Sequence, residues 1–174
     1  MEDALDAGAT AGGANDAIEN EMVEQLRDDP AYRNRLREAY DEAGVNLVSP
    51  TMGSLDPSSS YADGVRHDLT RWQGRIDAVD WFEKATTPES ARAVVERDHV
   101  GVVLNVQNLG AAIEGDVDEI DRLYDAGVRV AQLTYNSGNL VGTGCTERVD
   151  AGLTEHGVKT VRRCNDLGMV VDLS

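Results

Sequence analysis

The sequence has almost no lysine: Lys84 and Lys159 are the only two in 174 residues, and arginine supplies the other basic side chains. Asp and Glu total 32 against 16 Lys and Arg, which gives a formal net charge of −16. This charge repels the phosphates of nucleic acids and anionic lipid headgroups, so it argues against both as partners. An acidic, lysine-poor surface suits concentrated salt, where self-repulsion is screened. Two explanations of this composition remain open: the protein comes from a halophilic organism, or it is an ordinary acidic cytosolic protein.

Long apolar runs and targeting signals are also missing. No run approaches the roughly 20 residues of a membrane span. The first residues, MEDALDAGATAGG, have no basic region followed by an apolar core, and the last residues carry no lipid-anchor signal. Cys145 and Cys164 do not form a C-x-x-C pair and are more typical of free thiols than of a disulfide. We therefore predict a cytoplasmic protein that does not contact membranes.

The sequence does contain a repeated alternation of helical and extended patterns. Short apolar runs predict four strands, at residues 45–49, 100–106, 129–135 and 169–173. Glycines stand where a helix must end before a strand begins: Gly44, Gly127 and Gly168. Such units are typical of parallel strands joined by right-handed helical crossovers. The continuous apolar character of the strands indicates helices on both faces of a sheet or on the outside of a barrel.

The first 30 residues differ from the rest. They are acidic and rich in Ala, and we predict a weakly structured N-terminal segment with a short helix at 1–30, followed by the barrel-like domain at 31–174. Within that domain, residues 61–84 carry large apolar side chains at spacings of three and four, which predicts a helical region with a buried stripe. The stripe consists of Leu69, Trp72, Ile76, Val79 and Phe82.

Polar residues follow directly after three of the predicted strands. They are Gln107-Asn108, Tyr135-Asn136 and Asp172 to Ser174. In α/β units the groups that carry chemistry lie just beyond the carboxyl ends of the strands. One interpretation is therefore a functional site at this edge. The other is that these side chains only bond the backbone of the loops.

Three motifs occur in order around these strand ends: Leu133-Thr134-Tyr135-Asn136, Gly152-Leu153-Thr154 and Val171-Asp172-Leu173-Ser174. This ordered set resembles the central block of the renal (membrane) dipeptidase family of zinc metallopeptidases. The resemblance covers residues 91–174 well and 33–50 more loosely. It implies an α/β fold of parallel (β/α) units from a TIM-like barrel, with a metal site at its top. A full barrel usually needs about 250 residues, so we expect an incomplete one.

The resemblance also implies roles for individual residues. Gln107 falls where catalytic members carry a glutamate that bridges two zinc ions, and Tyr135 falls where many have a substrate-binding histidine. Asn136 would face the substrate, and Asn139 would belong to the following active-site loop. A neutral amide is a poorer bridge than a carboxylate, which offsets the charge of two close dications. The two departures therefore predict a divergent member of the family.

One candidate metal ligand remains in the N-terminal segment. The resembled family opens with Asp-Gly-His-Asn-Asp, whose histidine and last aspartate bind metal. Gly12-Gly13-Ala14-Asn15-Asp16 is the local counterpart, so Asp16 would be a ligand, while Ala14 cannot be one. No apolar strand precedes it, and the alternative is a flexible acidic terminus. No histidine has metal-ligand spacing, and we assign all three to surface or loop positions: His67, His99 and His156.

Taken with the resemblance, these features predict a metal-dependent hydrolase, truncated or divergent, that cleaves dipeptides or similar small amides with zinc as cofactor. The alternative is a non-catalytic partial-barrel fragment or binding protein. We expect the chain to be inactive alone. Four parallel strands leave two open sheet edges and an apolar inner face, so we also expect self-association, with a homo-oligomer as one form of it.

Overall fold

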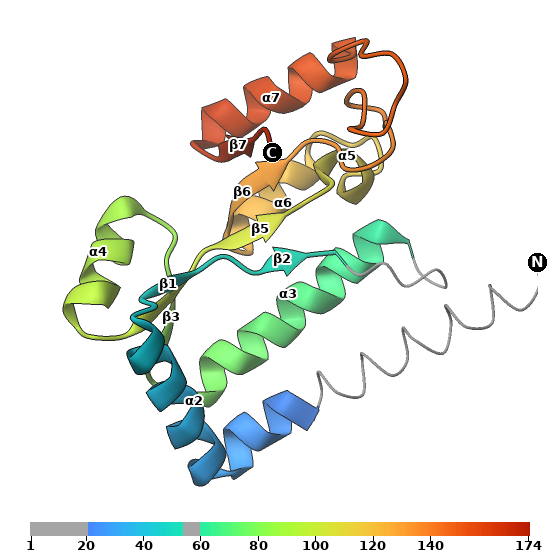
Figure 1. The fold of residues 1–174 in the computed structure, drawn as a ribbon. Helices are drawn as coiled ribbons and strands as arrows, with labels where there is room; N and C mark the ends of the chain where they lie inside the picture. Colours follow the sequence, from blue (N-terminus) through green and yellow to red (C-terminus); the bar gives the residue numbers. More distant parts are fainter. Residues whose placement is uncertain (1–20, 54–59) are drawn as a thin grey trace, which may run out of the picture.

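Helices and short strands alternate along residues 21–53 and 60–174, the part of the chain that the computed structural model describes (Figure 1). Residues 21–28 are helical and precede α2. The further helices are α2 (Pro30–Ala43), α3 (Tyr61–Ala78), α4 (Pro88–Glu96), α5 (Leu109–Ala112), α6 (Glu119–Asp125) and α7 (Glu155–Leu167). The strands are β1 (Leu47–Val48), β2 (Thr51–Met52), β3 (Phe82–Lys84), β4 (Val100–Val102), β5 (Leu104–Val106), β6 (Val128–Gln132) and β7 (Val170–Asp172).

Every pairing between these strands is parallel. The larger sheet has the order β2-β5-β6-β7, and the smaller one has the order β1-β4-β3. The ladder continues from one sheet to the other, because the amides of Val103 and Asn105 donate to the carbonyls of Val48 and Pro50 at 2.9 and 3.2 Å. The four predicted strands are therefore confirmed as parallel neighbours in sequential order.

The first strand extends further than predicted. We expected it to end at Ser49-Pro50, but pairing resumes at Thr51 and Met52, opposite Asn105 and Val106. Proline has no N–H to donate, which interrupts the ladder between β1 and β2 without ending it. The interruption is tolerated because this strand lies at the edge of both sheets.

The helical region predicted at 61–84 is too long. α3 ends at Ala78, Val79 is extended with φ −137° and ψ 139°, and Phe82–Lys84 forms β3 beside β4. Val79 and Phe82 are nevertheless buried as the stripe predicted. Phe82 fits the helical spacing in the sequence although it lies in a strand, from which it reaches the same core.

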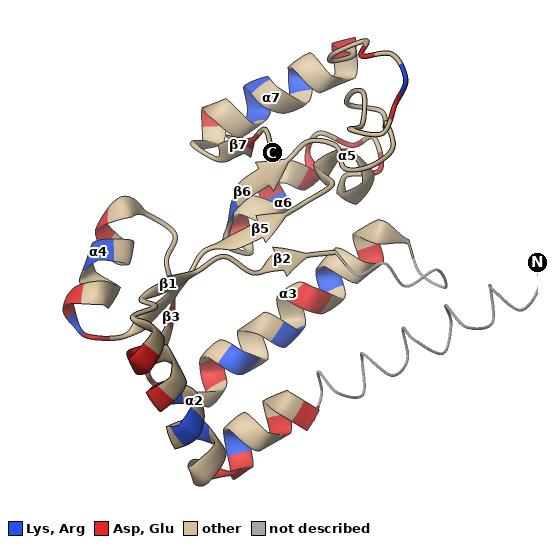
Figure 2. Ribbon diagram, viewed as in Figure 1, with Lys and Arg blue, Asp and Glu red and all other residues tan. Residues whose placement is uncertain are grey.

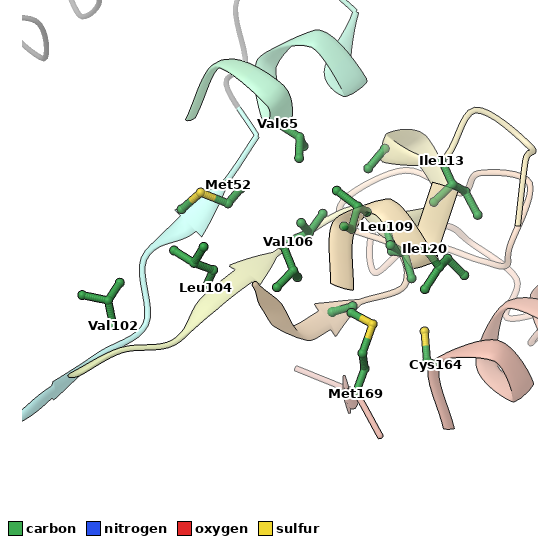
Figure 3. Packing of buried hydrophobic residues seen from close by; sticks show 14 of the residues in the cluster. Met52, Val65, Val102, Leu104, Val106, Leu109, Ile113, Ile120, Cys164 and Met169 are labelled. Carbon is green, nitrogen blue, oxygen red and sulfur yellow. The ribbon is translucent and has the colours of Figure 1, made fainter. Parts of the chain in front are cut away.

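One face of the larger sheet packs against helices. Met52, Val106 and Ala131 are fully buried on this face. α3 lies against β2, α6 against β6 and α7 against β7. Figure 3 shows the side chains that fill this layer, which come from strands, helices and connecting segments alike: Met52, Val65, Leu104, Val106, Leu109, Ile113, Ile120, Cys164 and Met169.

The opposite face of the larger sheet is mostly polar. Because side chains alternate along a strand, the residues next to the buried ones lie on this face. They are Thr51, Asn105, Val130, Gln132, Val170 and Asp172. We predicted an apolar inner face, and only Val130 and Val170 fit that description, Val170 being 59% exposed. The expectation was wrong because it treated each apolar run as uniform and overlooked Asn105 and Gln132 inside two of them.

Two helix ends follow the predicted signals, and two other positions bond the helix starts. Gly44 and Gly168 end α2 and α7 in the left-handed conformation, with φ of 65° and 75°. Thr154 caps α7 by accepting a hydrogen bond from the Gly157 amide at 2.9 Å. At α6 the cap position is Asp118, whereas Asp116 accepts from the Asp118 amide at 3.0 Å.

The helix at residues 21–28 contacts the core. Its Leu26 is 1% exposed, and Arg33 of α2 donates to the carbonyls of Leu26 and Arg27 at 2.9 and 2.7 Å. The division between segments at residue 30 stays a prediction. Charged residues of both signs occur along the helices, as the coloured ribbon in Figure 2 shows for α2, α3 and α4. Within residues 21–53 and 60–174, no helix is long and apolar enough to cross a membrane.

Candidate functional site

The carboxyl ends of β2, β5, β6 and β7 meet at one edge of the larger sheet. Met52 pairs with Val106, Val106 with Ala131, and Ala131 with Val171. The next residue in each strand belongs to a row across this edge: Gly53, Gln107, Gln132 and Asp172. Three neighbouring strands therefore present polar side chains at one level. The strand-end residues predicted from the sequence lie at this edge. Asp16, the candidate metal ligand, lies outside the described residues.

Gln107 is half-buried between the end of β5 and the start of α5. Asn108 occupies the N-cap position of α5, but its side chain makes no cap hydrogen bond. Its Oδ1 instead accepts a hydrogen bond from Asn139. The segment after β5 is thus fixed by the loop that follows β6.

Asn139 uses its amide for contacts inside the protein. Its Nδ2 donates to Asn108 Oδ1 at 2.7 Å and to the Leu133 carbonyl at 2.9 Å, while its Oδ1 accepts from the Val141 amide at 2.7 Å. Gly110 permits this approach, because a Cβ there would overlap the Asn139 side chain. Asn139 therefore fastens the loop to α5. Its contact with substrate stays a prediction.

Tyr135 and Asn136 are exposed at the start of the same loop. Their carbonyls accept hydrogen bonds from the amides of Cys145 and Thr146 at 3.0 and 2.9 Å, and the Thr146 hydroxyl also donates to the Asn136 carbonyl at 2.6 Å. The backbone is held by these bonds while the Tyr135 side chain remains 38% exposed. This arrangement leaves both side chains accessible to a ligand.

Tyr61 lies at this edge and was not found by sequence reasoning. Its hydroxyl donates to the Met52 carbonyl at 3.3 Å, and its ring fills the space beside Gly53, whose φ is 120°. Asp68 holds the same turn by accepting from the Gly53 amide at 2.9 Å. Burial raises the pKa of Tyr61 to about 12, and the charges of Asp68 and Tyr135 add to the rise. Tyr61 is therefore neutral near pH 7.

A cleft of about 320 Å³ lies between the ends of β6 and β7 and the loop after β6. Gln132, which sequence reasoning also missed, is 8% exposed in its wall, and its Nε2 donates to the Ser174 carbonyl. Asp172 accepts from the Ser174 amide at 2.8 Å, and this hydrogen bond holds the pKa of the carboxyl below its usual range. The only signal for Gln132 was that a polar amide interrupts the apolar stretch Val130-Ala131-Gln132-Leu133.

The sequence profile of the membrane dipeptidase family, peptidase family M19, matches residues 57–174. This stretch is more than half of the chain. It contains three of the four residues in the strand-end row: Gln107, Gln132 and Asp172. The chain belongs to the membrane dipeptidase family.

Known proteins of this kind resemble the chain in sequence and in fold. An uncharacterized dipeptidase of Schizosaccharomyces pombe is 35% identical over 153 residues. An amidohydrolase of Pseudomonas aeruginosa is 28% identical, with a TM-score of 0.71. A metallopeptidase of Rhodobacter sphaeroides, solved with a phosphinate mimic of the dipeptide L-Ala-D-Ala, is 18% identical with a TM-score of 0.62, which shows the fold alone.

The chain spans less than half of the first two relatives. The alignments cover 80% and 81% of this chain, but only 37% of the S. pombe dipeptidase and 42% of the P. aeruginosa amidohydrolase. The parallel α/β fold of this member of the membrane dipeptidase family therefore corresponds to part of the TIM-like barrel of its structural neighbours. The prediction of an incomplete set of barrel units is confirmed.

The described residues of this family member do not fit a zinc site by themselves. Structural and catalytic zinc sites use three or four protein ligands, chiefly Cys, His, Asp and Glu. Residues 21–53 and 60–174 contain no group of three such side chains placed to hold one ion. Of the three histidines, His99 contacts Glu83 at 2.6 Å and directly precedes β4, whereas the strand-end row lies at the carboxyl ends of the strands. Gln107 offers a neutral amide at the position where the resemblance implies a bridging carboxylate.

Proposed function

We propose that the chain provides the substrate-facing strand ends of a metal-dependent hydrolase that cleaves dipeptides. Membership of the dipeptidase family carries this proposal. It is supported by the position of Gln107, Tyr135 and Asn136 at the edge where the parallel strands end, which is the functional edge of α/β barrels. The proposal includes zinc as the metal. It also includes Asp16, which lies outside the described residues, as one of the zinc ligands.

The residues at this edge suit the binding and orientation of a small amide. The Gln107 amide both donates and accepts hydrogen bonds, as a peptide group requires. The exposed phenol of Tyr135 adds a donor next to an aromatic surface. Asn139 positions these groups by fastening the loop of Tyr135 to the segment of Gln107. Their role is to hold the peptide bond, and the metal chemistry falls to groups outside them.

A second candidate function is a non-catalytic protein that binds small peptides or amides on the same fold. The neutral Gln107 favours it, together with the absence of a three-ligand group among the described residues. Both candidates use the same strand-end row. They differ in whether a bound dipeptide is cleaved.

Hydrolysis by the protein isolated from its own host separates the two. The protein is tagged in the host, purified with whatever segments or partners accompany it, and supplied with L-Ala-L-Ala and L-Ala-D-Ala with or without a chelator. The proposed function predicts release of alanine that the chelator abolishes and that Gln107→Ala lowers. Dipeptide binding without chelator-sensitive release would favour the non-catalytic protein. Three further points remain proposals: the cytoplasmic location, the halophilic source and the homo-oligomer. The size of the purified protein tests the homo-oligomer, and the cell fraction from which it is recovered tests the location.

A further inference from the structure

A second cleft lies on the helical side of the larger sheet, between α3, α5 and α6. Its volume is about 290 Å³, and α3 packs against α5 beside it. Six apolar residues line its floor and walls: Ala62, Val65, Leu69, Ala112, Leu123 and Ala126. Three of them are alanines, whose short side chains leave the space open. In another protein an apolar cavity of about 150 Å³ holds one benzene molecule, so this cleft has room for a compact apolar group.

The rim of this cleft carries two arginines from different helices. Arg66 of α3 and Arg122 of α6 both line it, with side chains 56% and 75% exposed. Each pairs with a carboxylate three residues before it in its own helix, Arg66 with Asp63 at 2.6 Å and Arg122 with Glu119. Among the described residues, only Nη1 of each guanidinium has a hydrogen-bond partner. The Nε and Nη2 groups of both arginines are therefore available to a ligand.

Two arginines beside apolar walls select a particular ligand chemistry. A guanidinium binds a carboxylate through two parallel hydrogen bonds, which are stronger than those between neutral groups. Exposed ion pairs within one helix contribute little to stability, so a ligand carboxylate can displace Asp63 from Arg66 at low cost. Glu119 also lines the cleft, and its negative charge disfavours a second carboxylate on the ligand. The cleft therefore favours one carboxylate joined to a compact apolar body.

We propose that this cleft binds monocarboxylates with a compact aromatic or branched aliphatic body. The body lies among the side chains of Val65, Leu69 and Leu123, and the carboxylate lies at the rim against Arg66 and Arg122. The site is separate from the strand-end row, because its residues belong to or directly follow the outer helices. It does not depend on the proposed function. A bound ligand joins α3 to α6 and stabilises the folded chain by mass action.

The test is a titration of the 174-residue chain with 3-phenylpropionate and with its neutral amide, 3-phenylpropionamide, followed by NMR of the methyl groups. Salt at about 0.15 M screens the repulsion from the net charge of −16 beyond about 8 Å. We expect the carboxylate to shift the methyl signals of Val65, Leu69 and Leu123. The amide should bind about tenfold more weakly, because it lacks the charge-assisted hydrogen bonds. Equal binding of the two compounds, shifts confined to the strand-end row, or no shift at these methyls would overturn the proposal.

Three variants locate the carboxylate. Arg66→Gln and Arg122→Gln should each weaken binding of 3-phenylpropionate about fivefold and leave binding of the amide unchanged. Asp63→Asn frees Arg66 and should tighten binding about threefold, a gain that misfolding does not produce. Arg92→Gln is the matched control, since Arg92 of α4 forms the same kind of pair with Glu89 at 3.8 Å and does not line the cleft. Unchanged binding in both arginine variants, or no gain in Asp63→Asn, contradicts the proposal.

Discussion

Asn139 and Asn108 share a hydrogen bond of 2.7 Å that joins the loop after β6 to the start of α5. The two residues are 31 positions apart in the sequence. The bond therefore sets the distance between the segments that carry Gln107 and Tyr135. The relative position of these two segments therefore depends on an amide that reaches across the loop.

Asn139→Ala removes three hydrogen bonds and leaves the Asn108 side chain and the Leu133 carbonyl without this donor. We expect the free energy of unfolding to fall by about 1–3 kcal/mol, because partly buried polar groups lose their partner. Chemical denaturation measures the change. Asn34→Ala, at an exposed position of α2, serves as the control and should have little effect. Equal stability of the two variants would show that the Asn139 amide does not hold the loop.

Gly110→Ala places a methyl group where the Asn139 side chain lies. We expect a loss of roughly 1–3 kcal/mol from overpacking, with greater hydrogen exchange at the Val141 amide. Gly74→Ala is the matched control, since a Cβ there would lie 3.5 Å from Val23 in ordinary contact. In the middle of α3 this change should add about 0.5–1 kcal/mol to stability. If both variants change the free energy of unfolding in the same direction, the Asn139 side chain does not limit the space at Gly110.

Acid should destabilise the fold in part through Glu83. A hydrogen bond from Arg97, with a further one from His99, holds the pKa of Glu83 below its ordinary value of 4.5. A carboxyl whose pKa is lower in the folded state stabilises the fold above its unfolded pKa. This contribution is lost as the pH falls below 4.5 through the folded-state pKa. In Glu83→Gln the melting temperature should be lower at pH 7 and should converge with that of the original chain in acid. Glu96→Gln, at an exposed position of α4, is the control and should leave the melting temperature at pH 7 nearly unchanged.

Sequence patterns predicted the parallel strands well because their order depends on local signals. Apolar runs and helix-ending glycines each act within a few residues. The β3 strand was missed because Phe82 satisfies the period of the preceding helix as well as that of a strand. The roles of Asn139 and Gln132 were missed for another reason: each depends on a partner more than 30 residues away, which no local pattern reports.

Salt should change both stability and association. With a net charge of −16, the chain repels itself at low salt, and screening relieves this repulsion. We expect a higher melting temperature in concentrated salt, together with self-association through the outer edge of β7, which has no further strand beside it among the described residues. Sedimentation at low and high salt, read with thermal melting, separates the two effects. A compact monomer that melts cooperatively at both salt levels would mean that the four β/α units close their own core.

The account depends most on the claim that the strand-end row binds substrate but lacks a complete metal site. Zinc calorimetry on the 174-residue chain, paired with a dipeptide hydrolysis assay, tests this claim most directly. Because zinc sites need three or four protein ligands, we predict weak zinc binding and no measurable hydrolysis by this chain alone. Tight zinc binding, or hydrolysis of L-Ala-L-Ala that a chelator abolishes, would contradict the account.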